Sequence, residues 1–219
     1  MAEETTTEPA VEEANDQLIK CPCCGELTLR KPLDIKSAVL DEYLASLISG
    51  FPFQHTYPIH NSIDITVSVL TKTERTKIYS ALQLLDTLSK TIGETDPEAR
   101  TKVDDLDAAL QLYSYITEIQ TRKDDRVVAT FTPANQMNML CDAILKEQPE
   151  ILSYAIAQDA PGDVVEKTAG LYDIYCTEKS VSAIPDVMLR AIVRTHIDLH
   201  NILMNNGFDA NFWKGIELV

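Results

Sequence analysis

The chain lacks several features that mark whole classes of protein. No apolar run approaches the roughly 18 residues that cross a bilayer, so we expect no membrane-spanning segment. Its 219 residues include 19 Lys and Arg against 34 Asp and Glu, which gives a net charge of −15. Nucleic-acid binders need cations to displace phosphate counterions, so this charge argues against DNA or RNA as a partner. The seven scattered glycines form no phosphate-binding loop.

The cysteines and the N-terminal residues argue against a secreted protein. Five cysteines, an odd number with three of them clustered, do not make a disulfide framework. Residues 1–17 have neither the basic start nor the apolar stretch of a signal peptide. We therefore expect no export and a reducing cytoplasm as the compartment. The same residues hold six acids and no base, which predicts a disordered acidic tail over 1–17.

Residues 18–70 predict a small α+β unit. "ELTLR" (26–30) alternates as a short strand, and "SIDITVSVL" (62–70) alternates as a half-buried strand. Between them, a helix is expected after Asp34 and before Gly50. Its apolar positions follow helical spacing and are Ile35, Val39, Tyr43, Leu47 and Ile48.

Residues 71–207 predict a helical domain. Thr71 and Glu74 form a capping box that opens a helix ending at Gly93. Asp96-Pro97 opens a second helix with an apolar face that extends through Tyr113 to Ile116, and Thr132-Pro133 opens a third. Further helices are expected over about 150–158, 162–177 and 185–206, whereas 126–131 is either a third strand or an extended linker. The predicted fold class is mainly α, a helical bundle with a small N-terminal α+β part and a short two- or three-stranded β element.

The stretch "KCPCCGE" (20–26) has the spacing of half a zinc site. Cys21 and Cys24 can chelate one ion around a tight turn, and the glycine lets the backbone approach the sulfurs. A closed structural site needs four ligands, and no second C-x-x-C is present. His55 and His60 are the nearest candidates to complete it, unless another chain does so. A redox pair or a purely structural turn are the alternatives.

Other ionisable residues favour structural roles. His196 and His200 lie four apart in "HIDLH", but a metalloprotease motif needs Glu directly after the first His, where Ile197 stands. His196 falls on an apolar stripe, so we expect a hydrogen-bonded core histidine. Cys141 is also expected to be a small buried side chain. Nothing builds a nucleophile with a base and an orienting group, which predicts that the protein is not an enzyme.

The C-terminal segment 208–219 is apolar and holds the only tryptophan. Phe212, Trp213 and Ile216 are costly to leave in water, at about 25 cal/mol per Å² of apolar surface. They either dock on their own bundle or form a partner-binding anchor, since Trp-centred clusters are enriched at interface hot spots.

Three stretches, which together make up about half of the chain, follow one another in a familiar order: "LTLRKPLDIKSAVLDEYLASLISGFPFQHTYPIHN", "DITVSVLTKTERTKIYSAL" and "NFWKGIEL". In this order they resemble the small acidic tail-assembly and baseplate-associated proteins of tailed bacteriophages. In that family a strand carrying x-L-x-x-R-x-P leads into a helix, a V-x-x-L-T-x-x-E junction begins a helical domain, and the chain can finish in D/N-F-W. The cysteine knuckle is not part of that pattern.

The resemblance implies a non-enzymatic virion or assembly protein that acts by protein–protein contacts, located in the virion or the host cytoplasm. Its partners would be other phage structural proteins or further copies of the chain, and no cofactor would be needed. The alternative function is a zinc-binding regulatory adaptor that uses the CPCCG knuckle to hold one structural Zn.

Overall fold

A computed structural model describes residues 18–20, 27–29, 37–60, 62–124, 126–157, 161–177 and 184–206. The chain divides into two compact units, Met1–Lys36 and Ser37–Val219. In the first unit, strands β1 (Leu18–Lys20) and β2 (Leu27–Leu29) pair antiparallel, with Lys20 opposite Leu27. The strand predicted directly after the cysteine turn is therefore present as β2.

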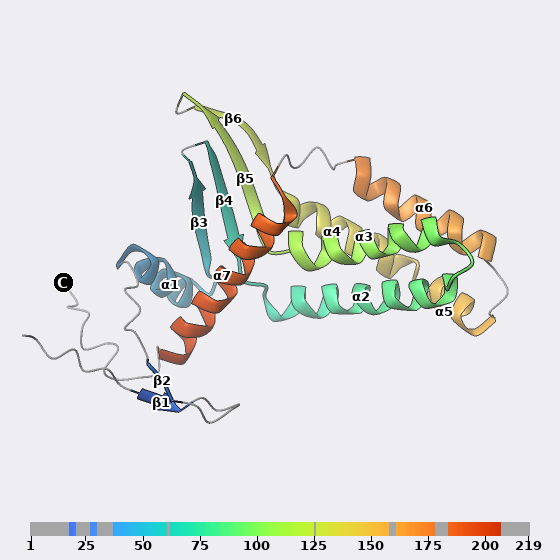
Figure 1. The fold of residues 1–219 in the computed structure, drawn as a ribbon, viewed down its shortest axis with the longest axis horizontal. Coiled ribbons are helices and arrows are strands. Elements are labelled where there is room, and N and C mark those ends of the chain that lie inside the picture. Colours follow the sequence, from blue (N-terminus) through green and yellow to red (C-terminus); the bar gives the residue numbers. More distant parts are fainter. Residues whose placement is uncertain are drawn as a thin grey trace, which may run out of the picture. The chain divides into compact units, whose positions relative to one another are not determined.

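In its described residues, the second unit combines seven helices with one antiparallel sheet of four strands in the order β3-β4-β5-β6 (Figure 1). Its elements are α1 (Ser37–Ser49), β3 (Gln54–Ile59), β4 (Ile63–Ser68), α2 (Lys72–Ile92), α3 (Pro97–Tyr113), β5 (Ile116–Lys123), β6 (Arg126–Phe131), α4 (Pro133–Lys146), α5 (Gln148–Ala157), α6 (Pro161–Thr177) and α7 (Asp186–Asn206). The predicted fold class, mainly α with a small β part, is confirmed. The sequence predicted a boundary at position 70 between an α+β unit and a helical domain. The sheet contains strands from both sides of that position, β3 and β4 before it and β5 and β6 after it.

The two faces of the sheet differ in polarity. Tyr57, Ile65, Ile119 and Phe131 stand opposite one another across the four strands and so share one face. Helix α7 packs on β4 and α1 packs on β3, and the Tyr57 hydroxyl contacts a side chain of α7 on this face. On the other face Thr56 and Thr66 hydrogen bond to each other and are not buried. The apolar side of the sheet is thus the side that receives α7.

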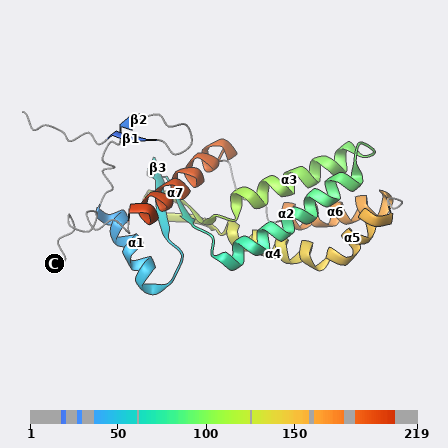
Figure 2. The ribbon, with the colours of Figure 1, turned by 90° about the horizontal axis from the view of Figure 1, so that it is seen from below.

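Helices α2 to α6 form a bundle in which α2 packs against α3, α4 and α5 (Figure 2). Fully buried large side chains fill it, including Leu85, Leu88, Leu106, Leu110, Ile144 and Ile151. Each such burial stabilises the fold by about 1.5–3 kcal/mol before entropy is counted. No helix in the described part of the chain is both long and apolar enough to span a membrane.

The predicted helix boundaries are largely confirmed. Thr71 accepts a hydrogen bond from the Glu74 amide while the Glu74 carboxylate accepts one from the Thr71 amide, which is the capping box read from the sequence. Asp96 caps α3 by accepting from the Ala99 amide. Gly50 and Gly93 follow α1 and α2 with positive φ angles of 71° and 59°.

Two expectations were wrong. Helix α3 ends at Tyr113, and Ile116 begins β5, so the sheet gains a strand and has four instead of two or three. Leu47 and Ile48, expected on the buried face of their helix, are 57% and 88% exposed. Only the earlier turns of α1 carry its buried contacts, through Val39 and Tyr43.

Candidate functional site

The cysteine turn, with the proposed ligands Cys21 and Cys24, lies outside the described residues. The described strands that precede and follow it in the sequence, β1 and β2, pair antiparallel. Among the described residues, no group of three or more His, Cys, Asp or Glu side chains is arranged to hold a metal ion.

The two histidines proposed as partners of the cysteines are not brought together. His55 is the second residue of β3, and its Nδ1 lies 2.5 Å from Glu42 Oε2 on α1. His60 is exposed and follows the end of β3, in a turn where its φ is 49°. Their Cα atoms are five residue steps apart along the chain, at about 3.3 Å for each step in a strand. Binding of one ion by both imidazoles therefore stays a prediction that the length of β3 does not favour.

His196 joins α7 to the sheet through both of its ring nitrogens. Nε2 lies 3.3 Å from the carbonyl oxygen of Phe53, and Nδ1 lies 3.2 Å from the hydroxyl of Tyr57. A carbonyl only accepts, so Nε2 carries the proton and donates, while Nδ1 accepts from the tyrosine. The side chain is fully buried, which confirms the expectation of a hydrogen-bonded core histidine.

This environment holds His196 neutral. Burial lowers the pKa of His196 to about 4, although the Phe53 carbonyl opposes that shift. Burial also raises the pKa of the Tyr57 hydroxyl to about 12, and the Glu42 carboxylate adds to the change. Both nitrogens of His196 are engaged and its ring is closed off from water. The residue therefore serves packing and not proton transfer or metal ligation.

His200 lies one helical turn further along α7 and is held less completely. Its ring is 6.1 Å from that of Phe53 and 6.1 Å from that of Tyr43 on α1. Burial, and secondly the charge of Arg75, lowers the pKa of His200. Its Nδ1 is buried without a hydrogen-bond partner among the described residues. The two histidines and Phe53 thus form a stacked group between α1, α7 and the start of β3.

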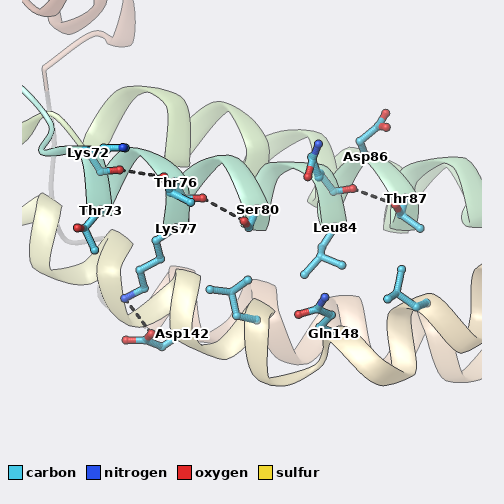
Figure 3. Close-up of a pocket in the computed structure, with 13 residues that line it drawn as sticks. Lys72, Thr73, Thr76, Lys77, Ser80, Leu84, Asp86, Thr87, Asp142 and Gln148 are labelled. Atoms are coloured by element: carbon cyan, nitrogen blue, oxygen red, sulfur yellow. Dashed lines mark hydrogen bonds and ion pairs between the residues drawn. The ribbon is translucent and has the colours of Figure 1, made fainter.

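A long groove of about 1130 Å³ runs between α2 and the α4–α5 pair (Figure 3). The Thr76, Ser80 and Thr87 hydroxyls line it, and each donates to the carbonyl four residues earlier. Lys77 lies 2.8 Å from Asp142. At the other end of the groove Asp86 pairs with Lys90. The charges that line the groove are balanced, so it offers no preference for a charged ligand.

Sequence reasoning missed a cluster of exposed apolar side chains at the end of α1. Leu47, Ile48 and Phe51 lie within five residues, and Ile48 and Phe51 are 88% and 75% exposed. Isolated apolar side chains are common on protein surfaces, whereas grouped ones mark contact sites. The signal was visible in "LISGF", because three large apolar residues flank a glycine that ends the helix. We call these three residues the α1 apolar cluster.

Phe212, Trp213 and Ile216, proposed as a partner-binding anchor, lie outside the described residues. Helix α7, which precedes them, is described to Asn206. Their role stays a prediction. No family model, curated protein or solved structure matches the chain.

Proposed function

We propose that this chain is a non-enzymatic bacteriophage virion or assembly protein that works through protein–protein contacts. Within that class it would be associated with the tail or baseplate, or act as a tail assembly chaperone. The observation that carries the proposal is the α1 apolar cluster. The resemblance of three sequence stretches to phage tail proteins supports the choice of partner.

The α1 apolar cluster is suited to contact because the helix that carries it is anchored by buried side chains while the cluster itself is exposed. On the inner side of the same helix, Tyr43 is buried edge-on against Phe53, with ring centroids 5.6 Å apart. Ile48 and Phe51 are already exposed on the outer side, so a partner can contact them without a movement of α1. Large apolar side chains of this kind supply most of the binding energy when a partner covers them. The net charge of −15 keeps such a surface soluble before assembly.

Affinity capture from infected cells tests the proposal. A tagged chain is expressed during infection, and the captured proteins are identified by mass spectrometry. We expect tail or baseplate proteins, and at least a tenfold lower yield from the double variant Ile48→Asp/Phe51→Ser. Tyr79→Ser is the matched control, because Tyr79 is a 63% exposed aromatic residue on α2. Capture of no virion protein by the folded wild-type chain would contradict the proposal.

Deletion of residues 208–219 tests the C-terminal anchor separately. If the truncated chain stays folded and still captures its partners at the wild-type level, Phe212, Trp213 and Ile216 are not the anchor. The contribution of the α1 apolar cluster is unaffected by that result.

The paired strands β1 and β2 favour a second candidate, a zinc-binding adaptor. A turn that joins antiparallel strands is the setting in which a C-x-x-C pair chelates zinc. Elemental analysis of protein purified without chelator decides between the two candidates. We expect close to one equivalent of zinc if the adaptor proposal is right, and its loss in Cys21→Ser/Cys24→Ser. Less than a tenth of an equivalent would remove this candidate.

A further inference from the structure

A small polar cavity of about 230 Å³ lies where the sheet meets the ends of three helices. It is separate from the α2–α4–α5 groove and is lined from β3, β4, β5, α2, α4 and the turn after α3. Its polar lining includes Ser68, Glu74, Ser114, Thr117 and Asn138. A volume of this size holds a few waters or a ligand of several heavy atoms.

Two of the hydroxyl groups in the lining can only accept further hydrogen bonds. Ser68 Oγ donates its proton to the Val69 carbonyl at 3.1 Å. Thr117 Oγ1 donates its proton to the Thr66 carbonyl, also at 3.1 Å. A hydroxyl has one proton and two lone pairs, so what remains on both oxygens is acceptor capacity.

Ser114 adds an oxygen that has no hydrogen-bond partner among the described residues. The residue is 6% exposed, and its Oγ is buried without a hydrogen bond. A buried hydroxyl without a hydrogen bond is unfavourable, so a ligand that contacts it removes that cost. Ser114 also caps the C-terminus of α3, where unpaired carbonyl groups carry partial negative charge.

Glu74 is the only ionisable side chain among the residues that line the cavity. Its Oε2 accepts both hydrogen bonds from Thr71, from the amide at 2.8 Å and from the hydroxyl at 2.7 Å. Its Oε1 has no partner among the described residues. The cavity therefore combines one negative charge with several acceptor oxygens.

We propose that this cavity binds a small primary ammonium group, which supplies three N–H donors and one positive charge. Glu74 Oε1 would take the charge, and Ser114 Oγ with the Ser68 and Thr117 hydroxyls would accept the remaining hydrogen bonds. The N-terminus of α4 at Ala134 also reaches the lining and favours an anion. The full charge of Glu74 outweighs that partial charge, and the net charge of −15 attracts cations to the surface.

The test is an NMR titration of the full chain with methylammonium chloride, read at the backbone amides. We expect shifts at Ser114, Thr117, Ala134 and Asn138 that saturate with ligand. Tetramethylammonium has the same charge but no N–H donor, and sodium acetate has the opposite charge. Equal saturation with tetramethylammonium, or binding of acetate in place of methylammonium, would overturn the proposal.

Variants then assign the contacts. Glu74→Gln removes the charge while an amide at this position still completes the capping box, and we expect affinity to fall about tenfold. Ser114→Ala removes the unpaired acceptor and should weaken binding about threefold. Ser80→Ala is the control, since Ser80 faces the groove and not this cavity. Unchanged affinity in both cavity variants would also overturn the proposal.

A further titration distinguishes a free amine from the lysine side chain of a binding partner. Nα-acetyl-lysine amide carries the same ammonium group on a protein-like stem. Tighter binding of this compound than of methylammonium assigns the site to a partner lysine, and tighter binding of methylammonium assigns it to a free amine. Either result requires saturation at the same amides.

Discussion

The imidazole of His196 lies face to face with the ring of Phe53, with centroids 4.8 Å apart and ring planes 11° apart. The same phenylalanine also accepts a hydrogen bond from His196 through its backbone carbonyl. The ring of Phe53 therefore excludes water from the imidazole, and its carbonyl fixes the tautomer that carries the proton on Nε2. Because His196 belongs to α7, this contact ties the last described helix to the beginning of β3.

Acid should weaken the fold through His196. Its pKa is lowered from 6.5 to about 4 in the folded state, so the unfolded chain binds more protons between those pH values. The stabilisation by the neutral ring is complete above about pH 6.5 and is lost as pH falls toward 4. The loss amounts to about 3 kcal/mol in the free energy of unfolding. Urea denaturation between pH 7.5 and 5 measures the upper part of this change, above the range where most carboxylates titrate.

A variant that cannot titrate supplies the control. His196→Gln keeps a hydrogen-bond donor but has no proton to gain, so its free energy of unfolding should depend less steeply on pH. His200, also with a lowered pKa, should account for part of the remaining slope. Parallel pH profiles for the wild type and His196→Gln would show that the ring is not the titrating group.

Removal of the Tyr57 hydroxyl should leave His196 Nδ1 buried without a donor. We expect Tyr57→Phe to lower the free energy of unfolding by about 1–3 kcal/mol at pH 7.5. In the wild type, long-range ¹H–¹⁵N spectra should show protonation at Nε2. A wild-type spectrum with the proton on Nδ1 would contradict the assigned hydrogen bonds.

The boundary between α3 and β5 shows why part of this fold could not be predicted. Ile116 pairs with Val67 while Glu118 pairs with Thr66, so Thr117 is an extra residue in β5. The bulge puts Ile116 and Ile119, three positions apart, among the fully buried side chains. That spacing is helical, and it continues the pattern of α3 without a glycine or proline to interrupt it. Residues 116–119 form a strand and not a helix because they pair with β4, and that pairing cannot be read from the local sequence.

Features that depend on contacts between residues close in the sequence could be predicted. The capping box at Thr71 and the glycine stops at 50 and 93 involve contacts within one turn, and each was predicted. The α1 apolar cluster depends instead on how much of α1 is covered. The spacing of Val39, Tyr43 and Leu47 is regular, yet only the first two are buried. The acceptor-rich cavity draws residues from positions 52 to 138, so no local pattern could indicate it.

Two glycines should respond oppositely to alanine. Gly93 has φ 59° and ψ −132°, a conformation that side chains avoid, so Gly93→Ala should lower the free energy of unfolding by about 1–3 kcal/mol. Gly170 lies inside α6, where an added Cβ meets nothing within 4 Å. Gly170→Ala should raise the free energy of unfolding by about 0.5–1 kcal/mol, because alanine loses less entropy in a helix. Thermal and urea denaturation measure both changes, and a shift of the same sign in the two variants would contradict the reasoning.

Cys141 should be unreactive in the folded protein. It is fully buried on α4, and burial raises its pKa from 9.0 to about 11, which lowers the thiolate fraction about a hundredfold at pH 8. Iodoacetamide labelling followed by peptide mass spectrometry should therefore modify Cys141 at least a hundredfold more slowly in the native protein than in urea. The same sample reports Cys21 and Cys24, whose protection in the native protein and release by chelator would indicate bound zinc. Rapid labelling of native Cys141 would contradict this expectation and show that the bundle around α4 opens readily, since the thiol is fully buried.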